Sequence, residues 1–486
     1  MGFNIAFLIC ATGVAGLFYL NRDKSAGVSK AIWLPILWLA MNGSRSAATW
    51  LYIWTGISIG GSVGGDLYAQ MDGSPLDAVI YALFLIVGVA ILLRRKPQAR
   101  AILLASAPIL LWYGYCLVSV LWSRIPEVAI KRWTKDLGDV AMALLIATEV
   151  DPPEALQRLF AGVGFILLPA SVLLIRYSPL GRAYDPSGGP VNTGVTTNKN
   201  SLGLLAFVIT IGAVWSLIQV LRSKHRSNKK RKLVAMGTLV VFGFVVLAQA
   251  HSATSIACTV LGSALMFATF LPQVKRTPAG IHVLVLSSLA IGGVMMLFGG
   301  EGAVLGALGR DSTLTGRTEI WAAVLPMCPN GLVGAGFESF WNTYGGDIRS
   351  LGTFASGINE AHNGYIEVYL NLGWMGIGFL ALILVTGYLR AAAAFRRNPQ
   401  IGSLMLAFLA TTAMYGITEA GFRILTPTWT FLMIAHITST RYALDRPRSL
   451  GSRGGVTKKR SAATIMPSGI SIPNPAIRKI PSFHRL

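Results

Sequence analysis

The architecture follows from residues 310–376, which read RDSTLTGRTEIWAAVLPMCPNGLVGAGFESFWNTYGGDIRSLGTFASGINEAHNGYIEVYLNLGWMG. A polar loop carrying Arg317 and His362 lies here between apolar runs near 281–299 and 364–389. A polar stretch of about 60 residues is too long to stay structureless in a compact protein. We therefore expect this loop to contain short helices and to carry a function.

Composition places the rest of the chain in a membrane. The chain has 486 residues, of which 53% are hydrophobic and 13% are charged, whereas about a quarter of the residues of a soluble protein are charged. Lipid cannot satisfy backbone hydrogen bonds, so spans are helices or closed barrels, and the continuous apolar runs here favour helices. The composition predicts an all-α, polytopic helical membrane protein.

Thirteen apolar runs are candidate spans, because a span needs about 17 to 25 apolar residues. Three of the runs are short or broken, namely 31–48, 137–149 and 425–440. We therefore predict about 11 to 13 transmembrane helices and a large external loop. The other runs lie near 3–20, 77–93, 101–122, 159–175, 201–221, 233–249, 253–271, 281–299, 364–389 and 403–420.

The basic residues predict the orientation, because Lys and Arg collect in short cytoplasmic loops. Most of the 42 Lys and Arg lie in segments that fall on one side if the spans alternate, and the segment 222–232 is the densest of them. The segment 123–136 falls on the opposite side, so either one span is miscounted or its cations act outside. The net charge of +22 is explained by these orientation signals, and we expect no nucleic-acid partner.

The domain organisation follows from this order. We predict a transmembrane domain over 1–440, with an external loop at 300–363, and a basic disordered cytoplasmic tail over 441–486. No positive charge precedes the first apolar run, so we expect no cleaved signal peptide. The six His and four Cys show no metal-ligand spacing, so neither a metal nor another cofactor is predicted.

Arg317 stands in a segment that reads as a helix start, with Gly316 as the cap and Glu319 as its capping-box partner. A cation in the first turn opposes the helix dipole by a few tenths to about 1 kcal/mol. A bound phosphate offsets that cost, since helix N-termini and guanidinium groups both favour it. Pairing with Glu319 or Asp311 is the alternative, and the sequence leaves both open.

His362 precedes the apolar run 366–389, so we expect it at the boundary between water and lipid. An isolated His at such a place usually has no special role. A helix N-terminus lowers the pKa of an imidazole and keeps it neutral, however, and a neutral imidazole can accept a proton.

At these residues the chain resembles the O-antigen ligase and polysaccharide polymerase superfamily of bacterial inner membranes. The pieces that carry the likeness in and beside the loop are 316–321, 334–340 and 361–376. Further pieces resemble the branch associated with exopolysaccharide production. They are 42–45, 73–77, 181–186 and 194–203. The likeness covers most of residues 30–440, and the ligase-like region is about 200–390.

The resemblance implies an inverting, metal-independent glycosyltransferase on the periplasmic face of the inner membrane. Its donor is a glycan on undecaprenyl diphosphate, and its acceptor is a glycan or lipid A core; polysaccharide export or chain-length proteins are further partners that it implies. Cations should stabilise the leaving diphosphate, and a general base should deprotonate the acceptor hydroxyl. His362 is the expected base and Arg317 its catalytic partner, with Glu360 as a reserve base. Substrate-binding positions are Arg45, Arg182, Lys199 and Glu419, and Glu419 is also a reserve base.

Two other classes of function remain as alternatives. A lipid-glycan flippase or polysaccharide transporter usually places ionisable residues deep in its spans. The spans here are nearly free of charge, with Asp139, Glu367 and Glu419 close to segment ends, which favours the enzyme. A structural subunit whose loop binds a partner protein is the other alternative. Ligase and polymerase share the donor chemistry, and the motif 194–203 favours a polymerase.

Overall fold

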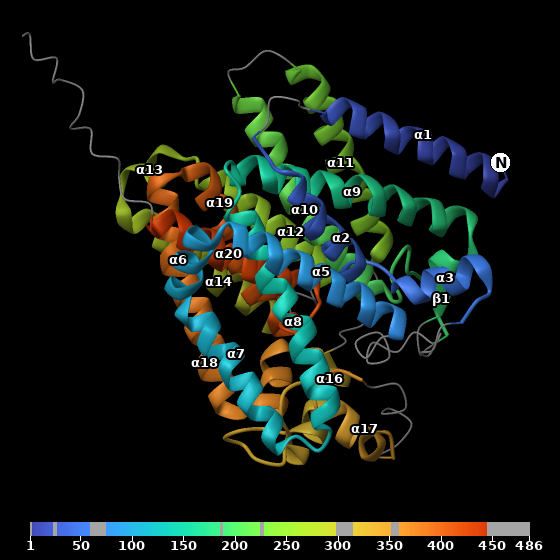
Figure 1. Cartoon of the computed structure of the whole chain (residues 1–486), viewed down its shortest axis with the longest axis vertical. Coiled ribbons are helices and arrows are strands. Elements are labelled where there is room, and N and C mark those ends of the chain that lie inside the picture. Colours follow the sequence, from blue (N-terminus) through green and yellow to red (C-terminus); the bar gives the residue numbers. More distant parts are fainter. Residues whose placement is uncertain are drawn as a thin grey trace, which may run out of the picture. The chain divides into compact units, whose positions relative to one another are not determined.

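The computed structural model describes residues 2–22, 27–58, 74–184, 188–223, 228–297, 314–350 and 359–444. Residues 1–445 form one compact unit, shown in Figure 1. Helices make up nearly all of the described secondary structure, as the composition predicted, and the exception is one short antiparallel hairpin. Residues 445–486 of the expected tail lie outside the described residues.

The helices of the first half are α1 (Phe3–Asn21), α2 (Trp33–Asn42), α3 (Ala47–Thr55), α5 (Pro75–Arg94), α6 (Lys96–Ala105), α7 (Ala107–Ser119), α8 (Pro126–Ala147), α9 (Pro152–Tyr177), α10 (Lys199–Arg222) and α11 (Lys229–Ala250). The later helices are α12 (Ala253–Ala268), α13 (Pro272–Arg276), α14 (Pro278–Leu297), α16 (Leu314–Val324), α17 (Phe340–Ser350), α18 (Gly364–Arg397), α19 (Pro399–Thr418) and α20 (Pro427–Leu444). The hairpin pairs β1 (Arg182–Tyr184) with β2 (Pro190–Asn192). Short 3-10 turns cover Lys30–Ile32, Val120–Trp122, Pro179–Gly181 and Leu325–Met327.

Seven described helices are long and apolar enough to cross a membrane, judged by length and composition. The pair α6 and α7 is bent by 78° and raises the number to eight if it forms one span. The chain therefore has the character of a multi-pass membrane protein, whereas the predicted number of 11 to 13 spans is not confirmed. The seven helices are α1, α5, α9, α10, α11, α18 and α19.

Three expected spans differ in the structure for local reasons. The run 31–48 is divided between α2 and α3, because the chain leaves the helix at Gly43. The run 101–122 is broken at Ser106, between α6 and α7. The run 137–149 is the second half of α8, whose first half is charged.

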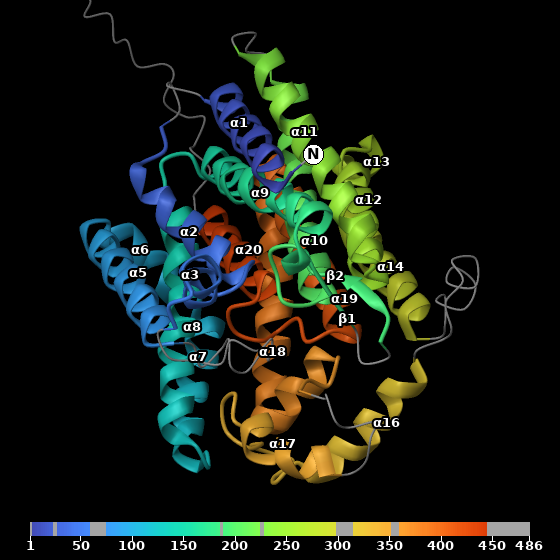
Figure 2. The same cartoon turned by 90° about the vertical axis from the view of Figure 1, so that its right-hand side faces the viewer.

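The core is built around α20, which carries Thr, Ser and His side chains and is buried from Pro427 to Thr440. Figure 1 and Figure 2 show α20 in the interior beside α8 and α18. By contrast, α1 exposes nearly all of its apolar side chains, as expected of a helix that faces lipid. Protein therefore surrounds α20, and its polar side chains need no contact with lipid.

The long polar loop before α18 packs onto the start of α18. It contains α16 and α17, and Figure 2 shows both at the end of the molecule opposite the start of α11. The segment 331–340 is fixed to α18 by backbone hydrogen bonds, including Ala335 N–H to Leu370 O at 3.0 Å and Gly336 N–H to Asn371 O at 2.8 Å. The Asn371 side chain also accepts the N–H of Ser339 at 2.8 Å. These bonds hold the loop as a structured cap.

The cations of the segment 123–136 contact this cap. The guanidinium of Arg124 lies over the Tyr344 ring at 5.2 Å, within the range of a cation–π contact. Arg132 is fully buried and donates to Glu338 O and to Asn342 Oδ1. These two cations therefore help to anchor the loop, which is a structural role for part of the segment that the orientation rule did not explain.

The joint between the cap and α18 requires Gly373. Its φ is 63°, in the left-handed region, and it interrupts the helical geometry of α18. A Cβ at this position would overlap the backbone of Leu332. Gly378, five residues along the same helix, has open space where a Cβ would lie.

We expect Gly373→Ala to lower the melting temperature of the detergent-solubilised protein, because both the backbone angle and the contact with Leu332 become strained. A cost of roughly 2 kcal/mol or more is the scale for a side chain forced into an incompatible backbone conformation. Gly378→Ala is the matched control and should leave the melting temperature unchanged or slightly higher. Equal melting temperatures for the two variants would contradict this account.

Candidate functional site

His362 lies in a strained loop just before α18. Its φ is 47°, a left-handed angle that is uncommon for a residue with a side chain. The preceding residue, Ala361, is held through both of its backbone polar groups. Its N–H donates to Glu367 at 2.6 Å, and its carbonyl accepts from the Trp321 indole at 2.8 Å. Asn363 then caps α18 through Tyr365 N–H at 3.0 Å. Neighbouring elements therefore fix the imidazole in place.

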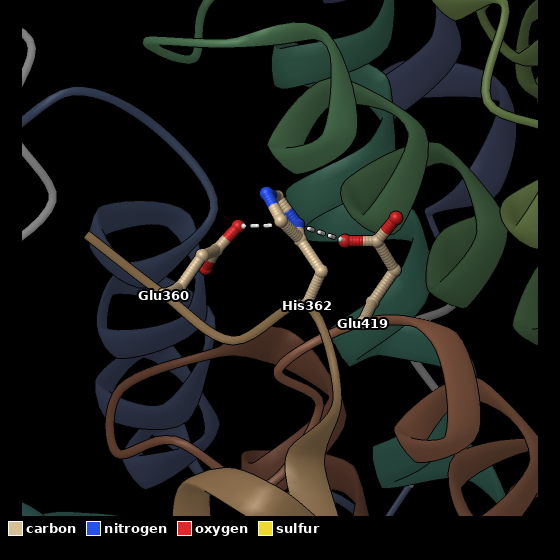
Figure 3. Close-up of side chains that lie close together, drawn as sticks. All are labelled: Glu360, His362 and Glu419. Carbon is tan, nitrogen blue, oxygen red and sulfur yellow. Dashed lines mark hydrogen bonds and ion pairs between the residues drawn. The ribbon is translucent and has the colours of Figure 1, made fainter. Parts of the chain in front are cut away.

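The imidazole stands between two carboxylates, as Figure 3 shows. His362 Nδ1 is 3.1 Å from Glu360 Oε1 and 3.3 Å from Glu419 Oε2. Each carboxylate also meets a guanidinium: Arg317 contacts Glu419 at 3.1 Å, and Arg423 contacts Glu360 at 3.4 Å. These five side chains form an alternating row of charges, which we call the His362 cluster. Both imidazole contacts use Nδ1, so Nε2 is the ring atom that can face a substrate.

Glu419 is placed where a helix alone would disfavour it. It is the C-cap of α19, and a carboxylate at a helix C-terminus opposes the dipole by roughly 0.3–1 kcal/mol. Its side chain is only 6% exposed, and it also accepts a 3.4 Å hydrogen bond from Asn200, at the start of α10. Arg317 and His362 offset both the dipole and the burial, so the position of Glu419 depends on the cluster.

Arg317 is in a different place from the one the sequence predicted. The helix α16 begins at Leu314, so Gly316 lies inside the helix and is not its cap. Glu319 is exposed, and the carboxylate partner of Arg317 is Glu419; Asp311 lies outside the described residues. The guanidinium still lies in the first half of a helix, where both the helix dipole and the guanidinium favour a bound anion.

The expectation of a neutral imidazole is wrong for the substrate-free protein. Burial lowers the pKa of His362, but the charges and hydrogen bonds of Glu360 and Glu419 outweigh burial and raise its pKa to about 10. Burial raises the pKa of Glu360, and the charges of His362 and Arg423 outweigh it and lower the pKa to about 2. His362 is therefore an imidazolium at neutral pH, because the two adjacent carboxylates favour the protonated ring more strongly than the helix dipole disfavours it.

This charge state predicts a pH-dependent stability. The pKa of His362 lies above its ordinary value of about 6.5, so its contribution is full below pH ~6.5 and is lost as the pH rises toward 10. The pKa of Glu360 is lowered, so its contribution is full above pH ~4.5 and is lost as the pH falls toward 2. We expect the melting-temperature difference between the wild type and His362→Asn to be largest near pH 5 to 6 and to shrink by pH 10. A difference independent of pH would refute the assigned charge state.

A metal ion is the other ligand that this geometry could admit. Glu360, His362 and Glu419 each offer a ligand atom, and these atoms lie within 4.8 Å of one another. The same carboxylates already pair with Arg317 and Arg423, and the imidazole carries a proton. A metal cation would have to displace those partners and remove that proton. With three positive and two negative charges, the cluster is better suited to an anion.

The other predicted site residues are distributed around the cluster. Lys199 begins α10 next to Asn200, which reaches Glu419. Arg182 is exposed on the β1–β2 hairpin, and no hydrogen bond or ion pair joins it to the cluster within the described ranges. Arg45 donates to the carbonyls of Leu180 at 2.7 Å and Gly194 at 2.8 Å. In this structure Arg45 ties two loops together, and its predicted role in substrate binding stays a prediction, as do those of Lys199 and Arg182.

Sequence reasoning missed Arg423 and Asn200. Arg423 is only 2% exposed and holds Glu360, the carboxylate nearest the imidazole. A signal was present, because Arg423 is a lone cation between the apolar runs 403–420 and 425–440. Asn200 had no signal apart from its neighbour Lys199.

The fold and this cluster define a class: an all-helical, multi-pass membrane protein with a row of buried and half-buried charges where the loop before α18 meets the turn between α19 and α20. The chain is similar to the "Exopolysaccharide production protein ExoQ" of Rhizobium meliloti (strain 1021), with 26% identity over 369 residues. The similarity covers 73% of this chain and 79% of that relative. No protein-family model matches the chain.

Proposed function

We propose that this protein is a membrane glycosyltransferase of exopolysaccharide production. It transfers or polymerises glycan units carried on undecaprenyl diphosphate, at the periplasmic face of the bacterial inner membrane. The similarity to an exopolysaccharide production protein supports the biological role. The His362 cluster supports the chemistry, and it is the observation on which the proposal rests.

The cluster can exchange one anion for another. Arg317 is 19% exposed and held by Glu419, whereas Arg423 is 2% exposed and held by Glu360. The diphosphate of an incoming donor can therefore compete for Arg317 more easily than for Arg423. When the diphosphate binds Arg317, the Glu419 carboxylate is released from its guanidinium partner and is free to accept a proton.

The reaction depends on both the binding of the diphosphate to Arg317 and the release of the Glu419 carboxylate. The acceptor hydroxyl oxygen bonds to the anomeric carbon from the face opposite the diphosphate, the bond from that carbon to the diphosphate oxygen breaks, and its electron pair leaves with the diphosphate. Arg317 and the His362 imidazolium stabilise the departing charge. The hydroxyl proton passes to the Glu419 carboxylate. The sequence assigned the role of base to His362. Because His362 already holds a proton in the substrate-free protein, we assign that role to its neighbour Glu419.

The direct test uses the purified full chain in lipid nanodiscs. A donor glycan on undecaprenyl diphosphate is supplied with an acceptor glycan, and the products are measured by mass spectrometry. We expect a new glycosidic bond and released undecaprenyl diphosphate, with no added metal. If the wild-type chain forms no such bond, the proposal fails in favour of a structural subunit.

The acceptor separates a polymerase from a ligase, and we propose the polymerase on the basis of the motif 194–203. Cells that lack the protein should accumulate single repeat units on the lipid carrier and make no polymer. Accumulation of finished polymer on the carrier would instead identify a ligase. Mass analysis of extracted lipid-linked oligosaccharides distinguishes the two.

One observation favours a lipid-glycan transporter as the second candidate. The helix α8 carries Asp136 and Asp139, both fully buried. Asp136 accepts from the Trp429 indole at 2.9 Å, and Asp139 accepts from the Trp38 indole at 2.6 Å. Asp139 therefore lies well inside α8 and not near a helix end, although α8 is not one of the seven helices that are long and apolar enough to cross a membrane. Movement of lipid-linked glycan across vesicles without bond formation, abolished by Asp139→Asn, would favour transport.

A further inference from the structure

A polar pocket lies beside the His362 cluster, formed by parts of the chain that are far apart in sequence. Its walls come from the α2–α3 connection, the start of α5, the start of α10 and the turn between α19 and α20. Three of these parts hold the motifs 42–45, 73–77 and 194–203, which the transfer chemistry does not use. Its volume is about 90 Å³, room for several water molecules at roughly 10–15 Å³ each.

The lining of the pocket is rich in neutral hydrogen-bonding groups. They include the side chains of Asn42, Ser44, Tyr81, Thr197 and Ser201. Hydroxyl groups that donate to the protein keep lone pairs that can accept, as Ser44 does after donating to the Ala40 carbonyl at 2.8 Å. The charged side chains of the lining are Asp77 and Arg423, and both have partners in the protein. Such a surface suits a neutral polyol.

Asn42 is the group that points to a missing partner. Its Oδ1 accepts from the Tyr81 hydroxyl at 3.0 Å, which fixes the amide. Its Nδ2 is buried and has no hydrogen-bond partner in the described part of the chain. A buried donor without a partner is costly, so a ligand oxygen that displaces the adjoining wall of the pocket and accepts from Nδ2 gains affinity.

The pocket is connected to the cluster at two points. Arg423 lines the pocket and holds Glu360. Ser201 lines the pocket next to Asn200, which contacts Glu419. A sugar in the pocket would therefore be linked to Glu360 through Arg423 and to Glu419 through Asn200. Arg45 lies next to Ser44 in the wall and ties the α2–α3 connection to Gly194, which explains why this cation faces the protein.

We propose that this pocket is the subsite for a neutral sugar of the acceptor glycan, with Asn42 donating to a sugar oxygen through Nδ2. This inference rests on the proposed function. The donor carries a diphosphate that cations can recognise, whereas an acceptor glycan offers only hydroxyl and ether oxygens. A pocket rich in neutral donors and acceptors, linked to the proton-accepting carboxylate through Asn200, matches the acceptor.

Asn42→Asp tests the subsite, because it keeps the shape and the acceptor for Tyr81 but replaces the Nδ2 donor with a carboxylate oxygen that can only accept. We expect the KM for the acceptor glycan to rise about fivefold, the effect of one hydrogen bond, while the KM for the lipid-linked donor and kcat stay within twofold. Asn42→Leu, which removes both bonds, should raise the acceptor KM further. Gln219→Ala is the matched control, since Gln219 Nε2 is also buried without a partner in the described ranges but lines none of this pocket.

A binding experiment separates this inference from the proposed function. The probe is the oligosaccharide released by mild acid from the producing cells' own exopolysaccharide, and the readout is the shift in melting temperature of the solubilised full chain. A shift that is seen with the wild type and Gln219→Ala, and lost in Asn42→Asp, supports the subsite even if no transfer is detected. An unchanged shift in Asn42→Asp, or a rise in the donor KM instead of the acceptor KM, overturns it while leaving transferase activity intact.

Discussion

Cells that carry His362→Ala in place of the wild-type protein are expected to make no surface polysaccharide. The variant removes the imidazolium that bridges Glu360 and Glu419 at 3.1 and 3.3 Å. Two carboxylates then face each other without their shared cation, and the leaving diphosphate loses a donor. Each of these changes weakens stabilisation of the transition state, so we expect kcat to fall by about 10²- to 10⁴-fold. The measurement is turnover of lipid-linked glycan by the purified variant, with polymer length on gels as the cellular readout.

Two further variants show whether the loss of turnover is specific to His362 and whether His362 acts as a cation or as a base. His251→Ala is the control, because His251 is an exposed residue at the end of α11, and it should retain wild-type turnover. His362→Lys keeps a cation but supplies no imidazole. If His362 acts as a cation, the Lys variant should recover part of the activity that the Ala variant lacks. If His362 itself is the base, both variants should be equally inactive, and the assignment of the proton to Glu419 would be wrong.

Arg317→Ala is expected to weaken binding of the lipid-linked donor by about 10- to 100-fold, measured as its KM. A charge-assisted hydrogen bond contributes roughly 1.5–3 kcal/mol, and a guanidinium can make two of them to a diphosphate. Arg182→Ala is the comparison, since Arg182 is exposed and has no contact with the cluster in the described chain. We expect its effect on the donor KM to be smaller than that of Arg317→Ala.

The alternative is that Arg317 serves only to neutralise Glu419, which is 3.1 Å away. The double variant Arg317→Ala with Glu419→Gln decides between the two roles. Removing both charges should restore the melting temperature that the single Arg317 variant loses, because the buried Glu419 charge, which keeps only His362 and Asn200 as partners in that variant, is then removed as well. Glu419→Gln also removes the proposed base, so donor affinity is measured here by direct binding of the lipid-linked donor to the purified variant. If the double variant binds the donor as tightly as the wild type does, Arg317 does not bind the diphosphate and that part of the proposal fails.

Part of this site could be predicted from the sequence. His362 and Arg317 stood out because each is a functional side chain in a polar loop next to an apolar run. Glu419 was recognised as a polar residue at the end of a run. What could not be predicted is that these three meet, since Arg317 and Glu419 are 102 positions apart. The charge state of the imidazole was missed for the same reason, because its pKa depends on carboxylates from two different segments.

The sequence by itself determined the all-helical membrane character, the positions of the long apolar helices and the presence of a structured polar loop, since hydrophobic runs and turn-forming residues are local properties. Tertiary structure alone decided which charges are neighbours, that Arg423 supports Glu360, and that described residues of the motifs 42–45, 73–77 and 194–203 line one pocket. Helices of similar hydropathy can pack in many orders, and only their packing decides which side chains meet at their ends. The proposed chemistry of this protein depends on those contacts between side chains.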